Sequence, residues 1–398
     1  MALLGLTVDE ETARRVTAGL PVVDVARVPG AAQAEPGRPV RLLEGRGRVV
    51  ACGVTDPENE VVRVWARGEV RAFDAAFFKS RVKAAWELRT SLGLPEKDAA
   101  YRVFHGDGDG LSGITADAYG PFVVLYAYSK GLLPAGRQVA QALLEVGGFQ
   151  GVVVKLRARG GAKPGQVKQD VVGVEPPESM TVKELGIPLE VHPLAGLNVG
   201  LFTDMREHRR NIARFVTGKR VLNTFAYTGA ISVAAARAGA SAVTSVDLSS
   251  GVLKWAAENF RLSGLAPDHP RYKFETSDVA RFMERAVEAG ETYDVVVMDP
   301  PTVSAARAHS WSMKKDYPEL IANAARLMPA DKGGVLWVSA NAHGGAGVMK
   351  HIEKGMELSK RDAVILEVGG LPPDHPTPVA YPESRYLEVV YLRVLPEA

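Results

Sequence analysis

The stretch "RVLNTFAYTGAISVAAARAGASAVTSVD", Arg220 to Asp247, decides the class of fold to expect. Its apolar and β-branched residues predict buried strands at 220–225 and 242–247, with a helix over 229–239 between them. The same alternation of strand and helix patterns continues toward the end of the chain. An alternation of this length predicts an α/β fold, in which helices cover both faces of an open parallel sheet.

The composition is typical of a globular protein, with 46% hydrophobic and 24% charged residues, and the length of 398 residues predicts two or three domains. A formal net charge of +2 permits a nucleic-acid partner without requiring one. The single cysteine, Cys52, cannot form an internal disulfide and offers no thiolate cluster, so no metal site is expected. No stretch resembles a signal peptide or a transmembrane helix, which predicts a cytoplasmic protein with no membrane partner.

Three regions of the chain differ in pattern. Residues 1–72 consist of short period-2 apolar segments, which predict a small β-barrel. Residues 73–187 begin with a helical pattern and continue with strands and glycine-rich turns, which predicts a small α+β domain. Within it, the glycine-rich run 106–110 favours a hairpin turn over a phosphate-binding loop, because a strand pattern follows it. Residues 188–398 carry the predicted α/β domain.

Polar residues end four strands of the α/β domain. They are Asn223 and Thr224, Asp247, Ser277 and Asp278, and Asp299. Ligands of open α/β sheets bind outside the carboxyl ends of the strands, so these side chains are expected to share one crevice. Any one of them could instead cap a helix, an alternative that weighs as much as ligand binding for Asp278.

The turn at 223–230 indicates the kind of ligand. It carries Gly229 but lacks the Gly-x-Gly-x-x-Gly spacing that lets a backbone approach a pyrophosphate. Asp247 follows Gly229 by eighteen residues, close to the spacing at which an acid reaches ribose hydroxyls. A nucleoside without phosphates, such as S-adenosylmethionine, fits this pattern.

The segment "VVVMDPPTVS", residues 295–304, ends a buried strand at Asp299, Pro300 and Pro301. Two consecutive prolines supply no amide hydrogen and hold the backbone stiff immediately beyond the strand. Taken alone, the pattern fits a plain strand stop as well as a loop that presents Asp299 to a substrate.

Three segments together resemble a known family. They are "GLFTDMREHRRNIARFV", the opening stretch extended through "LSSGVLKWAAENFRLSGL", and "YDVVVMDPPTVS". The combination looks like the class I S-adenosylmethionine-dependent methyltransferases, Rossmann-like enzymes that modify bases of large-subunit ribosomal RNA. Residues 1–72 resemble the PUA domain of the cytosine-C5 branch of that group, and "DGDGLSGITADAYGPFVVL" resembles its central domain. The resemblance implies S-adenosyl-L-methionine as cofactor and RNA as partner.

The resemblance also implies roles for individual residues. Cofactor binding is expected at Asp204, Arg206, Arg209, Asn223, Thr224, Phe225, Tyr227, Gly229, Asp247, Leu248, Ser277, Asp278 and Asp299. The catalytic residues are expected to be Asp299, Pro300, Pro301, Thr302 and Asn341. Asp204, Arg206 and Arg209 form a motif before the first strand of the α/β domain. A guanidinium of this motif would bind the methionine carboxylate of the cofactor. Asn223 stands where many relatives place an acid.

The choice of base depends on a missing thiol. Methylation at C5 of a pyrimidine needs a thiolate that adds at carbon 6. Asn341 stands where the C5 branch places that cysteine, and Cys52 lies far away in the sequence, so cytosine C5 is disfavoured. Adenine-N6 enzymes carry an aromatic residue at the position of Thr302. The segments "DPPTVS" and "SANAHG" are more similar to the guanine-N7 branch, although Val303 replaces its aromatic residue.

The sequence therefore predicts an S-adenosylmethionine-dependent RNA base methyltransferase. Its expected partner is 23S ribosomal RNA or a large-subunit assembly intermediate, with guanine N7 as the preferred atom. One alternative is a small-molecule methyltransferase on the same fold. Another is an RNA-binding protein that keeps affinity for the cofactor without turnover. A homodimer is a further expectation.

Overall fold

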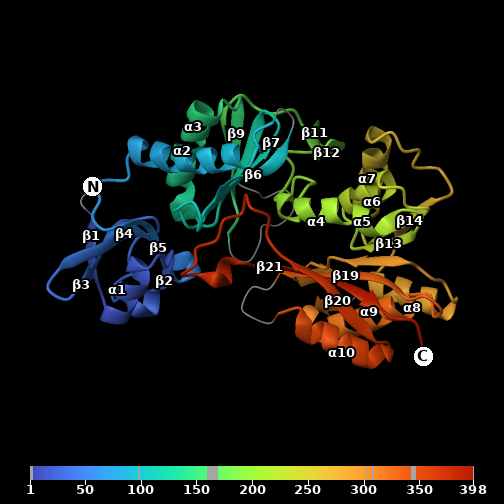
Figure 1. Cartoon of the computed structure of the whole chain (residues 1–398). Coiled ribbons are helices and arrows are strands. Elements are labelled where there is room, and N and C mark those ends of the chain that lie inside the picture. Colours follow the sequence, from blue (N-terminus) through green and yellow to red (C-terminus); the bar gives the residue numbers. More distant parts are fainter. Residues whose placement is uncertain are drawn as a thin grey trace. The chain divides into compact units, whose positions relative to one another are not determined.

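The computed structural model describes residues 3–96, 99–158, 169–301, 303–306, 309–341 and 347–397. It divides into two compact units, and Figure 1 labels most of their helices and strands. The first unit comprises Met1–Lys183, Val191–Val199 and Pro372–Ser384. The second comprises Glu184–Glu190, Gly200–Leu371 and Arg385–Ala398. Each unit therefore combines segments that are distant in the sequence.

The first unit begins with a five-stranded sheet in the order β1-β3-β4-β5-β2. Its elements are β1 (Leu4–Val8), α1 (Glu10–Thr17), β2 (Val22–Asp24), β3 (Pro39–Glu44), β4 (Arg48–Asp56) and β5 (Val61–Arg67). The register shifts between Leu42 and Leu43 and between Cys52 and Gly53, and such bulges bend strands. A Cβ atom on Gly53 would lie 1.9 Å from the carbonyl oxygen of Arg63, so only glycine permits this approach. The curled sheet encloses an apolar core, in agreement with the predicted barrel-like domain.

A second five-stranded sheet of the first unit has the order β10-β9-β8-β7-β6. Its elements are α2 (Ala75–Ser91), β6 (Ala100–His105), β7 (Ile114–Tyr119), β8 (Phe122–Ala127), α3 (Leu133–Gly147), β9 (Gly151–Leu156) and β10 (Gln169–Gly173). Strands β6 and β7 are antiparallel neighbours, and the N–H of Gly106 donates to the carbonyl of Ile114 at 2.9 Å. The prediction of a hairpin turn at 106–110 is thus confirmed. Both helices pack against the sheet in one apolar core.

The second unit is built on a seven-stranded sheet in the order β15-β14-β13-β16-β19-β21-β20 (Figure 1). The strands are β13 (Arg220–Thr224), β14 (Ala242–Asp247), β15 (Tyr272–Thr276), β16 (Val295–Met298), β19 (Gly334–Asn341), β20 (Ala363–Gly369) and β21 (Leu387–Val394). The first five strands in the order pair in parallel, and β21 runs antiparallel to both its neighbours. The predicted α/β fold is confirmed.

Two helices of the second unit precede β13, and the others follow strands along the chain. They are α4 (Arg206–Asn211), α5 (Ala213–Val216), α6 (Ala230–Arg237), α7 (Ser250–Leu262), α8 (Val279–Glu288), α9 (Met313–Arg326) and α10 (Met349–Ser359). Two further pairs of strands are small: β11 (Met180–Glu184) with β12 (Ile187–Val191), and β17 (Val303–Ala306) with β18 (His309–Ser312). All four residues of β16 are buried, as expected for a parallel strand covered on both faces. In the described ranges, no helix has the length and apolarity to cross a membrane.

Candidate active site

The carboxyl ends of the parallel strands bring the predicted polar residues to one edge of the sheet. In the register of the sheet, Thr224 lies beside both Val246 and Met298. Asp247 follows Val246 directly, and Asp299 follows Met298. The two acids therefore flank the end of β13 on either side, at one edge of the sheet, and the shared crevice stays a prediction.

The loop that follows β13 is held in a tight, partly left-handed conformation. The φ angles are +54° at Phe225, +49° at Tyr227 and +74° at Gly229. A Cβ atom on Gly229 would lie 2.7 Å from the Cβ of Ala256, so this position requires glycine for both conformation and space. The loop therefore has a constrained backbone directly after the end of β13.

Asp247 anchors this loop. Its Oδ2 accepts a hydrogen bond from the N–H of Tyr227 at 2.9 Å, and its Oδ1 accepts one from the N–H of Ser249 at 2.9 Å. A carboxylate has about four lone-pair sites, so acceptor capacity remains for hydroxyl groups of a ligand. Leu248, next to it, is exposed. The arrangement suits a carboxylate that fixes the loop and binds ribose at the same time.

Asn223 and Thr224 turn their side chains into the sheet. The amide of Asn223 donates to the hydroxyl of Ser232 at 2.9 Å, and the hydroxyl of Thr224 donates to the carbonyl of Val297 at 2.8 Å. Both residues are buried. Within the described structure the Oδ1 of Asn223 is buried without a hydrogen-bond partner. Such an oxygen costs about 1–3 kcal/mol, which a donor from a bound molecule or water would offset.

Ser277 and Asp278 lie beyond the end of β15. The N–H of Ser277 donates to the carbonyl of Asp247 at 3.0 Å, which ties the two strand ends together. Asp278 is the N-cap of α8 and accepts from the N–H of Arg281 at 3.2 Å. The helix-cap interpretation of Asp278 is thus confirmed, while its contact with the cofactor stays a prediction.

The basic motif before β13 is held by a carboxylate that the sequence did not indicate. Arg209 donates from two nitrogens to the two oxygens of Glu184, at 2.5 and 2.6 Å, and both side chains are buried. It also donates to the carbonyl of Phe202 at 2.6 Å. The guanidinium is therefore already paired, and its role toward the cofactor carboxylate stays a prediction.

The other members of that motif are also engaged. Arg206 is buried and its Nε lies 3.4 Å from Oε1 of Glu207. Asp204 accepts a hydrogen bond from the hydroxyl of Tyr386 at 2.8 Å. Tyr386 comes from the last segment of the second unit, so residues 182 positions apart meet here.

Asp299 occupies the position opposite Asp247 at the strand edge. The hydroxyl of Ser339 donates to its Oδ1 at 2.5 Å. Burial raises the pKa of Asp299 to about 6, and the negative charge of Asp204 adds to the rise, while Ser339 and Arg209 act in the opposite direction. The carboxyl is therefore poised to change charge near neutral pH, a property that groups at functional sites often share.

The remaining catalytic predictions lie around Asp299. Pro300 is buried and Pro301 is exposed, so the stiff dipeptide leads out of the sheet. Asn341, the last residue of β19, is partly buried. Thr302 lies outside the described residues. In the part of the chain that is described, no group of three or more His, Cys, Asp or Glu side chains could hold a metal ion.

The sequence did not indicate several residues of this site. Ser339 stands two positions before Asn341 and could have been found from that proximity. Tyr317 donates from its hydroxyl to the carbonyl of Ser339 at 2.6 Å and is fully buried. Glu184 and Tyr386 lie far from the motifs in sequence, and no spacing or composition indicates their partners.

The comparisons with known proteins agree with this geometry. Residues 145–355 match the family model of S-adenosylmethionine-dependent methyltransferases. The chain is 31% identical to ribosomal RNA large subunit methyltransferase I of Photobacterium profundum, over 88% of this chain and 89% of that protein. It is equally similar, at 31%, to the protein of the same name from Escherichia coli, over 93% of both chains.

A solved structure matches almost the whole chain. The crystal structure of SMU.776 complexed with SAH covers 98% of this chain and 100% of its own, with a TM-score of 0.88 and 27% sequence identity. The family match and this complex identify S-adenosylmethionine as the cofactor. The chain thus belongs to the S-adenosylmethionine-dependent methyltransferase family, in the group that includes the proteins named ribosomal RNA large subunit methyltransferase I.

Proposed function

We propose that this enzyme methylates a base of 23S ribosomal RNA, in free RNA or in a large-subunit assembly intermediate in the cytoplasm, with guanine N7 as the preferred atom. The names of the relatives support the RNA substrate, because the similarity extends over about nine-tenths of both chains. We assign the chemistry to residues 188–398 and the binding of RNA to residues 1–72 and 73–187. The homodimer stays a prediction.

In this proposal the loop 225–229 and Asp247 hold the nucleoside part of the cofactor. Asp247 accepts hydrogen bonds from the ribose hydroxyls through the lone pairs that Tyr227 and Ser249 leave open. Asp204 and Arg206 lie on the segment that faces the methionine end. Glu184 positions Arg209 and does not bind the ligand itself. The cofactor supplies an electrophilic methyl group on a sulfonium centre.

The observation that carries the choice of atom is the absence of a thiol from the strand edge. The sequence has one cysteine, and it lies fully buried in β4 of the first unit. Burial also raises the pKa of the Cys52 thiol, so the nucleophilic thiolate is disfavoured. Attack at carbon 6 of a cytosine needs that thiolate, whereas guanine N7 already carries a free lone pair.

Asp299 then acts on the charge of the product. Transfer to N7 requires alignment of the lone pair with the methyl group and no general base. The purine ring becomes cationic as the bond forms, and a carboxylate beside it lowers the energy of that developing charge. Ser339 and the stiff Pro300-Pro301 backbone hold Asp299 in place for this purpose.

The decisive experiment is mass spectrometry of nucleosides from 23S ribosomal RNA of cells with and without this gene. Loss of 7-methylguanosine on deletion is the expected result. Loss of 5-methylcytidine instead would overturn the choice of atom and keep the RNA substrate. An unchanged nucleoside profile would contradict ribosomal RNA as the substrate and favour a small-molecule methyltransferase or an RNA-binding protein without turnover.

Replacing Cys52 with serine should leave methyl transfer at the parental rate, because no cysteine takes part in the reaction. The measurement is transfer of labelled methyl groups to ribosomal RNA, with melting temperature as a control for folding, since Cys52 is buried. RNA that contains 5-fluorocytosine should form no covalent adduct. A trapped adduct, or activity lost in a folded variant, would restore cytosine C5 as the target.

A further inference from the structure

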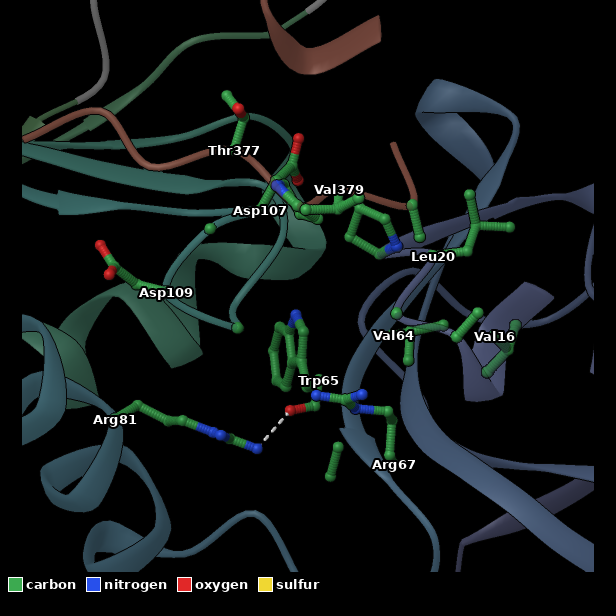
Figure 2. A pocket seen from close by; sticks show the side chains of 18 of the residues that line it. Val16, Leu20, Val64, Trp65, Arg67, Arg81, Asp107, Asp109, Thr377 and Val379 are labelled. Carbon is green, nitrogen blue, oxygen red and sulfur yellow. Dashed lines mark hydrogen bonds between the residues drawn. The ribbon is translucent and has the colours of Figure 1, made fainter. Parts of the chain in front are cut away.

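The first unit contains a cavity of about 520 Å³ that is separate from the strand edge of the second unit (Figure 2). Its walls come from the α1–β2 turn, the end of β5, helix α2, the hairpin turn 107–110 and the segment 377–380. All of these belong to the first unit. None of the residues that line this cavity has a role in the proposed methyl transfer.

Two arginines of the cavity lack a carboxylate partner. Arg67 ends β5, and Arg81 lies on α2, where its Nη2 donates to the carbonyl of Trp65 at 2.8 Å. The Nε of Arg81 is buried without a hydrogen-bond partner, and neither guanidinium forms an ion pair within the described ranges. Burial and the nearby positive charge of Arg67 lower the pKa of Arg81. Arg81 also lies over the ring of Phe77, 5.1 Å from its centroid, so the two guanidinium groups line one cavity without a carboxylate partner.

The carboxylates of the cavity have other partners. Asp109 is held by Arg89, whose Nη1 donates to it at 2.8 Å, and by the N–H of His105 at 2.6 Å. Asp107 is partly buried, and its side chain is hydrogen-bonded to Ser112. Neither carboxylate pairs with Arg67 or Arg81, so an anion bound in the cavity would add favourable charge interactions with both guanidinium groups.

The cavity also has apolar side chains, and Figure 2 shows Asp107 and Thr377 near Val379. Figure 2 shows Arg67 and Arg81 below Trp65 in the view, with Val379 above it. Val379 is fully exposed, and Leu20 and Val64 line the same cavity. The segment that carries Val379 touches the hairpin turn so closely that a Cβ atom on Gly108 would lie 1.9 Å from the carbonyl of Pro376. The cavity therefore combines a cationic wall with an apolar wall.

We propose that this cavity binds one nucleotide of the RNA substrate, with a backbone phosphate on Arg67 and Arg81 and the base against Leu20, Val64 and Val379. A guanidinium pair matches phosphate oxygens by shape and charge, and an apolar wall accepts any base through its flat face. The proposal rests on the proposed function, because it takes RNA as the substrate. It adds a site in the first unit that binds the RNA strand through its backbone.

The test compares Arg67→Gln with Arg71→Gln, because both side chains are exposed and only Arg67 lines the cavity. The full-length proteins are titrated with a fluorescent single-stranded fragment of 23S ribosomal RNA at several salt concentrations. Arg67→Gln should weaken binding by about five- to tenfold, and the slope of log affinity against log salt should fall by about 0.7, the value for one phosphate contact on a single strand. Arg71→Gln should change binding less than about twofold.

A second variant tests the apolar wall. Val379→Glu places a negative charge beside the bound strand and should weaken binding by at least about fivefold through repulsion of phosphate. Its side chain is fully exposed, so the melting temperature should stay at the parental value. Parental RNA affinity in this variant would contradict a nucleotide at that wall.

The outcomes separate this site from the proposed function. If the parental protein methylates ribosomal RNA while Arg67→Gln and Arg71→Gln bind it alike, the nucleotide site is overturned and the proposed function stands. If no RNA is methylated but Arg67→Gln still loses affinity selectively, the site stands and the proposed function fails. If the parental protein binds no RNA, both proposals fall.

Discussion

Replacing Asp299 with alanine should lower the rate of methyl transfer by at least about tenfold, which corresponds to about 1.4 kcal/mol in the barrier. The carboxylate acts most strongly once positive charge develops on the accepting base, so the rate should change more than the cofactor affinity. Single-turnover transfer of labelled methyl groups to RNA, with cofactor binding measured separately, checks this split. Asp331→Ala is the matched control, because Asp331 is exposed before β19, at the other end of the strand that carries Ser339.

The pH dependence gives the same prediction a second readout. The pKa of Asp299 is about 6, so transfer should be highest above pH 6 and should fall as the carboxyl becomes protonated below it. Asp299→Asn should be slow at every pH and should lose this dependence. A parental rate in Asp299→Ala would mean that the Asp-Pro-Pro turn is only a strand stop.

The stability of the cofactor-free protein should depend on pH in the opposite direction to the transfer rate. The folded-state pKa of Asp299 is raised above its ordinary value of 3.8, so the favourable contribution of this carboxyl is present below 3.8 and is lost as the pH rises through about 6. Asp299→Asn should therefore melt higher than the parental protein above pH 6. This shift shows that the substitution leaves the fold intact while transfer is lost.

Replacing Asp247 with alanine should weaken S-adenosylmethionine binding by about 1.5–3 kcal/mol, or about tenfold to 150-fold, because charge-assisted hydrogen bonds are lost. Part of the loss comes from the loop, since Asp247 also accepts from the N–H groups of Tyr227 and Ser249. Calorimetric titration of the folded variant measures the effect.

Two further variants complete the Asp247 experiment. Asp268→Ala removes an exposed carboxylate from the loop before β15, at the opposite end of the sheet, and should bind the cofactor like the parental protein. Asp247→Asn keeps one acceptor oxygen and should lose less affinity than Asp247→Ala. Unchanged affinity in a folded Asp247→Ala protein would remove this residue from the ribose site.

Local patterns in the sequence were sufficient to predict the parallel sheet and the edge at which Asp247 and Asp299 lie. The strand and helix patterns that start at Arg220 predicted the parallel sheet, because residue periodicity follows directly from backbone geometry. Parallel strands meet at one edge with their carboxyl ends, so Asp247 and Asp299 had to lie near the end of β13. The hairpin turn at 106–110 followed from its glycine and aspartate residues and from the strand pattern after them.

Only the tertiary structure decided how these groups are charged and paired. The bond between Arg209 and Glu184, and the raised pKa of Asp299, depend on which distant segments meet and on how much water they exclude. The same holds for the cavity beside Arg67 and Arg81, whose walls come from five separate segments. Electrostatic energies vary with distance and burial in three dimensions, and no periodicity or spacing along the chain records either quantity.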